Sequence, residues 1–348
     1  MKDLFKILIS PTLVVYSSII KMRNNYFDNG KFKSEKVNSK VISIGNITVG
    51  GSGKTPTVIY VTNMLKEAGK KVGILSRGYG RKTKGYLLVS KGDKILTDVD
   101  DCGDEMYLAT DECGVASAVC EKRVEGAQKL LSEVPLDVIV LDDAFQHRWI
   151  YRDIDILIFD QKFLLKTGTI EQKMLPLGMM REPFSSAKRA DVILINRKFD
   201  EKKKISKKIL DNFKGKKLFY AHYEASGFYD LKSHEFFKIE EFHGQKSLVV
   251  CGIARPYSFL RVLEQNNVDI SNKILFPDHK DYSGKEVEEI RKKFYDTNSY
   301  SVVTTQKDAV KLKKFAKELD DIDIYYLKID LKIEKEEEFK ETIFNIIN

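Results

Sequence analysis

The fold is decided by residues 41–57, V-I-S-I-G-N-I-T-V-G-G-S-G-K-T-P-T. The first residues are mostly β-branched and predict a buried strand, and the glycines after them predict a turn. Beyond Lys54, apolar residues recur at helical spacing as Val58, Val61 and Leu65. Glycines lack a Cβ, so successive backbone amides of such a loop can surround phosphate oxygens, and the positive end of the helix dipole adds to the attraction. The stretch therefore predicts a strand, a phosphate-binding loop and a helix.

The phosphate-binding loop gives individual side chains a role. Lys54 would reach the β and γ phosphates of a nucleotide, and the Thr55 hydroxyl would bind Mg²⁺. The pattern G-x-x-x-x-G-K-T is broken at one place, because Thr48 stands where the first glycine is expected. The alternative is a glycine-rich turn that happens to precede a lysine. The expected nucleotide-binding residues are Thr48, Val49, Gly50, Gly51, Ser52, Gly53, Lys54 and Thr55.

The composition is typical of an α/β protein with two domains. The chain has 348 residues, 43% hydrophobic and 32% charged, and a domain takes about 150 residues. The net charge of +8 favours polyanions, which include nucleotides, acidic lipid and nucleic acid, without choosing among them. The cysteines have no C-x-x-C spacing, so the sequence indicates neither a zinc site nor a disulfide framework. We expect each of them to be a small core residue: Cys102, Cys113, Cys120 and Cys251.

The N-terminal segment is apolar, but Lys6 and Pro11 interrupt it. Its apolar length is therefore below the roughly 20 residues that a membrane-spanning helix needs. Ser10 and Pro11 predict the start of a helix, and the apolar side chains from there to Phe27 gather on one side of a helical wheel. Two interpretations stay open: a basic amphipathic helix on an anionic membrane surface, or a helix packed on the domain.

Strand and helix patterns alternate after the loop, which predicts a mostly parallel sheet covered on both faces. One strand, residues 137–143, is apolar and ends in Asp142 and Asp143. In phosphate-loop enzymes a carboxylate at such a strand end lies beside Mg²⁺. Aspartate also follows buried strands because it forms turns, and this alternative stays open.

The pattern predicts five parts along the chain. The lysine run at 202–208 predicts the solvated face of a helix, and a second strand and helix series begins near residue 247. We expect an N-terminal amphipathic membrane-interface helix at 1–35, a three-layer phosphate-loop domain at 36–216, an extended linker at 217–244, a second, smaller α/β domain at 245–331, and a C-terminal helix at 332–348 that can pack back on the first domain.

The loop is compatible with several nucleotide-dependent classes. A GTPase should carry Asn-Lys-x-Asp at a later strand end, but Asn196 is followed by Arg197, Lys198 and Phe199. A partitioning ATPase should place a lysine before Gly50, where Val49 stands. Both absences favour a kinase or a synthetase. For the base that accepts a hydroxyl proton, Asp104 is a candidate, although its spacing alone favours an N-cap, and His147 and His279 are loop histidines.

A set of motifs occurs in order along the chain. They are G-N-I-T-V-G-G-S-G-K-T-P, S-R-G-Y-G-R from Ser76, G-D-E from Gly103, L-D-D-A-F-Q-H from Leu141, L-P-L-G-M-M-R-E-P from Leu175, P-D-H from Pro277 and T-T-Q-K-D from Thr304. Together these motifs resemble the tetraacyldisaccharide 4'-kinase family of lipid A biosynthesis. That family also lacks the first loop glycine, which accounts for Thr48. The match departs at Met106, Ala144 and Lys280, where the family usually has proline, glycine and tyrosine.

The resemblance implies a fold, an activity and a site. The fold would be a P-loop NTPase-like α/β/α domain with a second α/β domain, and the reaction would move the γ-phosphate of ATP to the 4' hydroxyl of an acylated glucosamine disaccharide 1-phosphate, at the cytoplasmic face of the bacterial inner membrane. Asp104 would be the base and His279 its partner, with Thr55, Glu105, Asp142 and Asp143 around Mg²⁺. The head-group and nucleotide site would include Arg77, Arg123, Gln146, His147, Arg181 and Glu182.

The same interpretation also names what the enzyme should not need. No nucleic-acid module is visible, so we expect no nucleic-acid partner, and we expect no obligate protein partner. An ATPase switch on the membrane that lacks a lipid acceptor stays as the alternative function.

Overall fold

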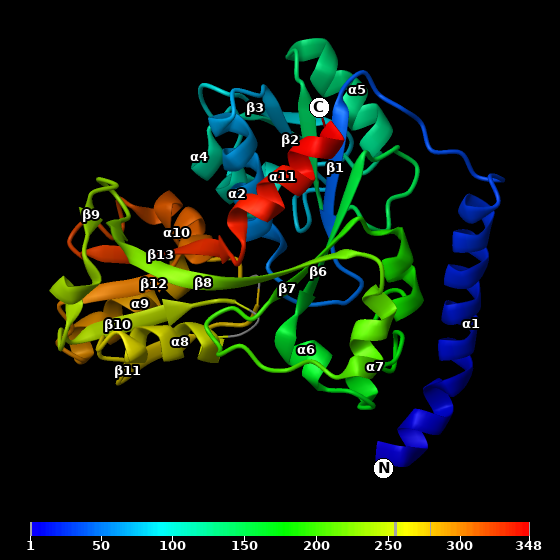
Figure 1. Ribbon diagram of the computed structural model, residues 1–348. Coiled ribbons are helices and arrows are strands. Elements are labelled where there is room, and N and C mark those ends of the chain that lie inside the picture. The colour runs from blue at the N-terminus through cyan, green and yellow to red at the C-terminus, as the bar shows by residue number, and fades with distance from the viewer. Residues whose placement is uncertain (1, 254–255, 279, 348) are drawn as a thin grey trace.

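The computed structural model describes residues 2–253, 256–278 and 280–347. It has two lobes joined by a pair of long strands, with an N-terminal helix on the outer side of the first lobe (Figure 1). The chain therefore consists of a first lobe that carries the phosphate-binding loop, a second lobe built from residues after 230, and α1 (Lys2–Asp28).

The first lobe is built on a parallel sheet with β1 (Lys40–Gly45) at its centre. On one side β1 pairs with β5 (Val138–Asp142), and on the other with β6 (Ile154–Asp160). These three strands are mostly apolar and almost entirely buried, as is usual for parallel strands covered on both faces. The sheet continues with β2 (Val72–Ser76), β4 (Ala116–Val119) and β7 (Val192–Asn196), and β3 (Leu87–Lys91) joins β4 as an antiparallel edge strand.

Helices cover both faces of this sheet. One face packs on α2 (Lys54–Glu67) and α4 (Asp104–Cys113), whose buried side chains share a core cluster with Ile42 and Ile44. The other face packs on α5 (Arg123–Glu133), where Ala127 and Leu130 lie against Val41. Alternate residues of β1 thus point to opposite layers, as the two-residue period of a strand requires. The fold class predicted from the sequence, a mostly parallel three-layer α/β sheet, is confirmed.

Two long antiparallel strands connect the lobes. The first residues of β8 (Lys217–Asp230) pair in parallel with β7, and the rest pair with β13 (Ile324–Ile333). The register shifts between Lys328 and Ile329, so the ladder contains a bulge as it passes from one lobe to the other. Residues 217–244, expected as an extended linker, therefore contain a strand of the main sheet, together with β9 (Phe236–Phe237) and a short 3-10 turn (Ile239–Phe242). How the chain divides into domains stays a prediction.

The second lobe continues the same sheet. Its strands β10 (Ser247–Cys251), β11 (Asn272–Leu275) and β12 (Ser301–Thr305) are parallel to one another and to β13. One face packs on α9 (Gly284–Asp296) and α10 (Gln306–Leu312), and the other on α8 (Pro256–Gln265). The order across the described sheet is β11-β10-β12-β13-β8-β7-β6-β1-β5-β2-β4-β3, with β9 beside β8.

The last helix, α11 (Glu336–Ile347), returns from the second lobe to the first (Figure 1). The Phe339 ring centroid lies 5.2 Å from that of Phe219, and the Tyr60 hydroxyl donates to Glu336 at 2.8 Å. The remaining elements are short: α3 (Val99–Cys102), α6 (Gln161–Leu165), α7 (Lys207–Leu210) and 3-10 turns at Ile170–Gln172, Phe184–Arg189, Asp211–Phe213 and Lys313–Phe315. All four cysteines are free and buried, as expected.

The lysine run at 202–208 does not form the predicted helix. Regular structure begins only at Lys207 and lasts four residues. Upstream, the Gln161 side chain accepts from the Lys203 amide at 2.9 Å and donates to the Glu201 carbonyl at 2.9 Å, while Ile205 is buried. These contacts to α6 satisfy the backbone of the segment in place of helical hydrogen bonds.

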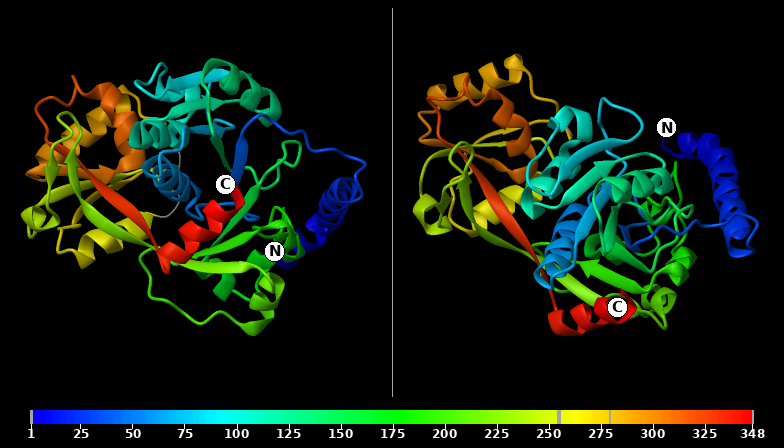
Figure 2. Two further views of the ribbon diagram at one scale, coloured as in Figure 1. Left: turned by 45° about the horizontal axis from the view of Figure 1, so that its top comes forward. Right: turned by 90° about the horizontal axis from the view of Figure 1, so that it is seen from above.

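The N-terminal helix lies on the side of the first lobe away from the second lobe (Figure 2). Its Tyr16 hydroxyl donates to the Arg181 carbonyl at 3.1 Å, its Asn24 amide donates to Glu182 at 2.9 Å, and Phe27 is buried. Its opposite side leaves apolar side chains exposed: Val14, Val15, Ile19 and Met22. Among the described residues no helix is long and apolar enough to cross a membrane.

Candidate functional site: a phosphate-binding loop at the junction of the lobes

The phosphate-binding loop has the backbone that its glycines predict. Gly50 and Gly53 have φ of 95° and 101°, in the left-handed region that glycine enters without strain. A Cβ on Gly53 would lie 2.3 Å from the Asn196 amide nitrogen and 2.4 Å from the Tyr223 hydroxyl. Gly53 is therefore required by packing as well as by φ.

Side chains at the ends of β1 and β7 hold the backbone and the Ser52 side chain of the loop in place. The Asn46 amide donates to the Ser52 hydroxyl at 2.7 Å, and the Asn196 amide donates to the Ser52 carbonyl at 3.3 Å. The Lys198 amine donates to the Gly51 carbonyl at 2.6 Å and pairs with Asp160 at 3.0 Å. Sequence patterns assign Asn196 and Lys198 no role beyond an incomplete GTPase motif, because only the parallel pairing of β6 with β1 and β7 brings them to the loop.

The segment 175–183 covers the other side of the loop. The Val49 amide donates to the Met179 carbonyl at 2.8 Å, and the Arg181 amide donates to the Ile47 carbonyl at 2.7 Å. The Arg181 guanidinium makes two hydrogen bonds to the Asp143 carboxylate, at 2.7 and 3.0 Å. Glu182, in contrast, is fully buried, pairs with Arg189 at 2.9 Å and accepts from Asn24 of α1.

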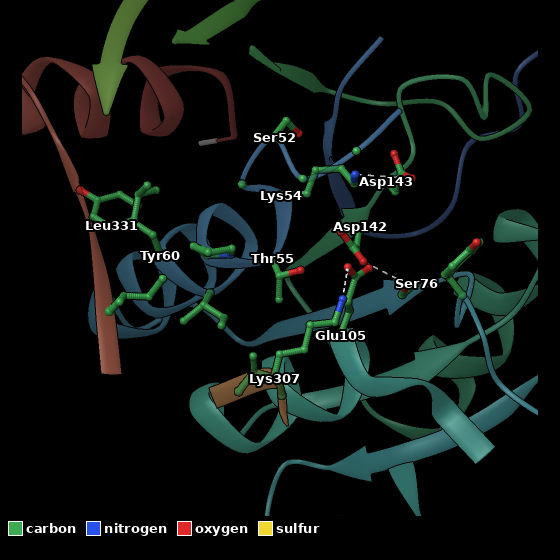
Figure 3. Close-up of a pocket in the computed structure, with 18 of the residues that line it drawn as sticks. Ser52, Lys54, Thr55, Tyr60, Ser76, Glu105, Asp142, Asp143, Lys307 and Leu331 are labelled. Carbon is green, nitrogen blue, oxygen red and sulfur yellow. Dashed lines mark hydrogen bonds and ion pairs between the residues drawn. The ribbon is translucent and has the colours of Figure 1, made fainter. Parts of the chain in front are cut away.

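Asp142 and Asp143 lie at the end of β5, beside the loop (Figure 3). The Lys54 amine is 3.8 Å from Asp143, and the Ser76 hydroxyl donates to Asp142 at 3.1 Å. Asp142 Oδ1 is buried and has no hydrogen-bond partner within the described part of the chain. Burial, Glu105 and Asp143 raise the pKa of Asp142 to about 6. A carboxylate in this state is stabilised by a cation at its unpaired oxygen, so the position fits Mg²⁺.

Asp104 and Glu105 are the first two residues of α4. Gly103, and not Asp104, is the N-cap residue of α4, so the alternative role of Asp104 as an N-cap is wrong. The Asp104 carboxylate is buried and lies 2.9 Å from the Lys311 amine, and the Lys307 amine lies 3.1 Å from Glu105. Both lysines come from α10 of the second lobe, and the sequence analysis gave neither a role, although Lys307 is part of T-T-Q-K-D. His279 lies outside the described residues.

Arginine, glutamine and histidine side chains surround the loop and the carboxylates. Arg123 is buried, donates to the Cys120 carbonyl at 2.7 Å, and has its pKa lowered to about 10 mainly by burial. Gln146 donates to the Asn46 carbonyl at 2.8 Å. Burial, with Arg123 as the next cause, lowers the pKa of His147 to about 4, so this histidine is neutral at pH 7. Arg77 is exposed at the cavity mouth and remains available to an anionic ligand.

These groups line one cavity of about 1220 Å³. Its walls come from both lobes and from α1, which contributes Tyr16, Ile20 and Arg23. Asp104 and Glu182 are not among its lining residues. The lining residues that the sequence predicted are Thr48, Val49, Gly50, Gly51, Ser52, Gly53, Lys54, Thr55, Arg77, Glu105, Arg123, Asp142, Asp143, Gln146, His147 and Arg181.

The carboxylates do not by themselves provide a complete set of protein ligands for a metal ion. Within residues 2–253, 256–278 and 280–347, no three His, Cys, Asp or Glu side chains are grouped so that they could hold an ion. Mg²⁺ commonly takes one or two carboxylates and fills its other positions with water and substrate phosphates. The unpaired Asp142 oxygen near Thr55 and Glu105 suits that mode (Figure 3).

These features are those of a P-loop nucleotide-dependent enzyme: a parallel sheet, a glycine loop before a helix, and a lysine that lies beside an aspartate at a strand end. The family model described as tetraacyldisaccharide-1-P 4'-kinase, LpxK, matches residues 5–348. The chain belongs to this family.

Individual relatives agree over nearly the whole chain. The tetraacyldisaccharide 4'-kinase of Chlorobium limicola is 34% identical, with 97% of both chains covered, and that of Aquifex aeolicus is 33% identical, again with 97% of both covered. The crystal structure of LpxK from Aquifex aeolicus in complex with ATP superposes with a TM-score of 0.80 at 30% identity, covering 99% of this chain and 100% of that one. The predicted family and enzyme class are confirmed, and an ATPase switch without a lipid acceptor is not favoured. The roles of single site residues stay predictions.

Proposed function

We propose that this protein transfers the γ-phosphate of ATP to the 4' hydroxyl of an acylated glucosamine disaccharide 1-phosphate, and that it does so at the cytoplasmic face of the bacterial inner membrane. The observation that carries the proposal is the shared cavity, in which a phosphate-binding loop, two strand-end aspartates and residues of α1 meet. A kinase for a lipid needs a nucleotide site open to water and a path from the bilayer to that site. The α1 side of the cavity supplies such a path.

The residues around the loop divide the work of phosphoryl transfer. Amides of the glycine loop and the Lys54 amine bind the β and γ phosphates, and Arg181 keeps Asp143 in place beside Lys54. Mg²⁺, held by Thr55, Glu105, Asp142 and Asp143, would add positive charge next to the transferred group. Of the two aspartates, Asp142 is the better ligand because Asp143 already pairs with two cations.

Asp104 accepts the proton of the attacking hydroxyl in this scheme. Its carboxylate lies at the start of α4, one residue from Glu105, which lines the cavity. Lys311 and Lys307 lie at 2.9 and 3.7 Å from the same Asp104 oxygen, so two cations face the carboxylate that would accept the proton. Arg77, Arg123, Gln146 and His147 would contact the phosphates of ATP or of the lipid head group.

α1 would hold the enzyme on the membrane. Its exposed apolar side chains are free to enter the head-group region, while its other face contacts the first lobe through Tyr16, Asn24 and Phe27. The two interpretations of the N-terminal helix are therefore compatible: one face packs on the first lobe, and the other face would contact the membrane.

The test is an assay with purified protein, ATP, Mg²⁺ and a detergent-dispersed acylated disaccharide 1-phosphate. We expect a product one phosphate heavier, with the phosphate at the 4' position. Asp104→Asn should lower turnover by about 10² to 10⁴ while ATP binding changes little, because a general base contributes that much to the rate. Equal ATP hydrolysis with and without the lipid, and no lipid product, would instead identify an ATPase switch.

A further inference from the structure

Lys307 is a lysine of the second lobe whose amine reaches the catalytic carboxylates of the first. It is the second residue of α10, and its Nζ lies 3.1 Å from Glu105 Oε1 and 3.7 Å from Asp104 Oδ2. One helical turn later, Lys311 Nζ lies 2.9 Å from the same Asp104 oxygen. The acidic start of α4 is thus bound to α10 by ion pairs that cross between the lobes.

The position of Lys307 differs from that of an ordinary surface lysine. Its side chain is 21% exposed and lines the cavity, where it points toward Glu105 with Thr55 and Asp142 close by (Figure 3). A partly buried cation between two carboxylates fixes where both carboxylates lie, since neither can move without losing an ion pair in a region poor in water.

We propose that Lys307 is a positioning residue for phosphoryl transfer: it holds the Asp104 and Glu105 carboxylates at the cavity, so that the reaction proceeds only while the second lobe is docked against α4. The inference rests on the proposed function, because it takes Asp104 and Glu105 as the groups that act on the phosphate acceptor and on Mg²⁺. It gives the second lobe a part in catalysis in addition to its part in enclosing the cavity.

The chain contains a second ion pair between the lobes, and this pair is a matched control for an effect that comes only from holding the lobes together. Lys314, seven residues after Lys307, forms an ion pair with Asp100, which also joins the second lobe to the first. That pair lies outside the cavity lining. If cross-lobe ion pairs act only by holding the lobes together, removing either lysine should have similar effects on the rate.

The experiment compares Lys307→Met, Lys307→Arg and Lys314→Met in the full chain. For each variant, kcat for lipid phosphorylation, KM for ATP, lipid-free ATP hydrolysis and Tm are measured. We expect Lys307→Met to lower kcat about 100-fold, the loss typical of a reacting group misplaced by about 1 Å, with KM for ATP little changed. Lys307→Arg should recover part of the rate because it restores the cation, and Lys314→Met should behave like the wild type.

Two results would overturn the inference. One is a kcat for Lys307→Met within about twofold of the wild type, far short of the loss that misplacement causes, and the other is an equal fall in Lys314→Met. If Lys307→Met does not fold, Lys307→Gln takes its place under the same criteria. If the wild type hydrolyses ATP without phosphorylating the lipid, the proposed function fails, but the hydrolysis rates of the same variants still decide the role of Lys307.

Discussion

Asp142 and Asp143 are consecutive residues with opposite electrostatic surroundings. Although burial opposes it, Lys54 and Arg181 hold the pKa of Asp143 below its usual range. Burial, Glu105 and Asp143 raise the pKa of Asp142 instead, and its Oδ1 has no hydrogen-bond partner among the residues described. A cation arriving from solution therefore gains more from Asp142 than from Asp143.

Asp142→Asn should show that Asp142 binds Mg²⁺, whereas Asp143 stabilises the fold through its ion pairs. We expect kcat to fall about 10²- to 10³-fold and the Mg²⁺ concentration for half-maximal rate to rise, because a charge that stabilises the transition state is lost. The Tm should stay the same or increase, since a buried and poorly compensated charge is removed.

Asp143→Asn should instead lower the Tm, because it leaves Lys54 and Arg181 without their carboxylate. Titration of the rate with Mg²⁺ and thermal melting check both; an unchanged Mg²⁺ dependence in Asp142→Asn would contradict this assignment.

The lowered pKa of His147 should make the protein less stable in acid. Its folded-state pKa of about 4 lies below the ordinary value of 6.5, so between these values the unfolded state binds more protons than the folded state. The stabilisation is fully present above pH 6.5 and is lost as the pH falls toward 4. The shift corresponds to about 3 kcal/mol, which solvent screening reduces to about 1–2 kcal/mol. Urea unfolding measures the free energy of unfolding at pH 7.5 and pH 5. The drop in this free energy between the two pH values should be smaller for His147→Gln than for the wild type. Equal drops would contradict a role of His147 in acid sensitivity.

At the scale of elements, α1 has two apolar faces with different surroundings. Phe27 packs within 5.2 Å of Phe32 and 4.9 Å of Trp149, measured between ring centroids, and so belongs to the first lobe. Val15, Ile19 and Met22 are 57%, 52% and 52% exposed on the other side. A helix that only packed on the domain would not need this second face.

Replacement of Val15, Ile19 and Met22 by serine should weaken membrane binding and leave the chemistry intact. Each side chain contributes about 1 kcal/mol if half of it enters the bilayer, so binding to anionic liposomes should fall about 100-fold. The kcat with detergent-dispersed lipid should stay close to that of the wild type. Liposome cosedimentation and the detergent assay measure the two quantities. Undiminished liposome binding would show that the attachment lies elsewhere.

The elements that the sequence predicted well are those with a strong local pattern. The strand predicted at 137–143 is β5, which begins and ends within one residue of those bounds, and the series predicted from near residue 247 begins with β10 at Ser247. The loop could also be predicted, since its glycines and lysine are contiguous. The helix predicted for the lysine run at 202–208 was wrong because Gln161, forty residues upstream, binds that backbone. Lys198, Lys307 and Lys311 could not be assigned because their partners are set by tertiary pairing.

At the scale of the molecule, one sheet runs through both lobes, so their relative placement depends on the β8 and β13 pair (Figure 1). The bulge in this pair is on β8, where Ser226 lies between Ala225, which pairs with Ile329, and Gly227, which pairs with Lys328. Gly227 has φ of 152°, and a Cβ there would lie 2.8 Å from the Phe237 carbonyl oxygen and 2.3 Å from the Phe236 ring. A side chain at this position must move either β9 or the bulge.

Gly227→Ala should therefore disturb the second lobe without touching the phosphate-binding loop. The strain is about 1–3 kcal/mol, and we expect kcat to fall about tenfold as α10 shifts relative to α4, while ATP affinity stays unchanged because the loop belongs to the first lobe. Gly244→Ala is the matched control, since Gly244 has φ of 70° but a Cβ there would meet no atom within 4 Å. It should lose about 1 kcal/mol of stability and keep its kcat. Equal kcat in the two variants, measured well below their melting temperatures, would show that the bulge does not set the position of the second lobe.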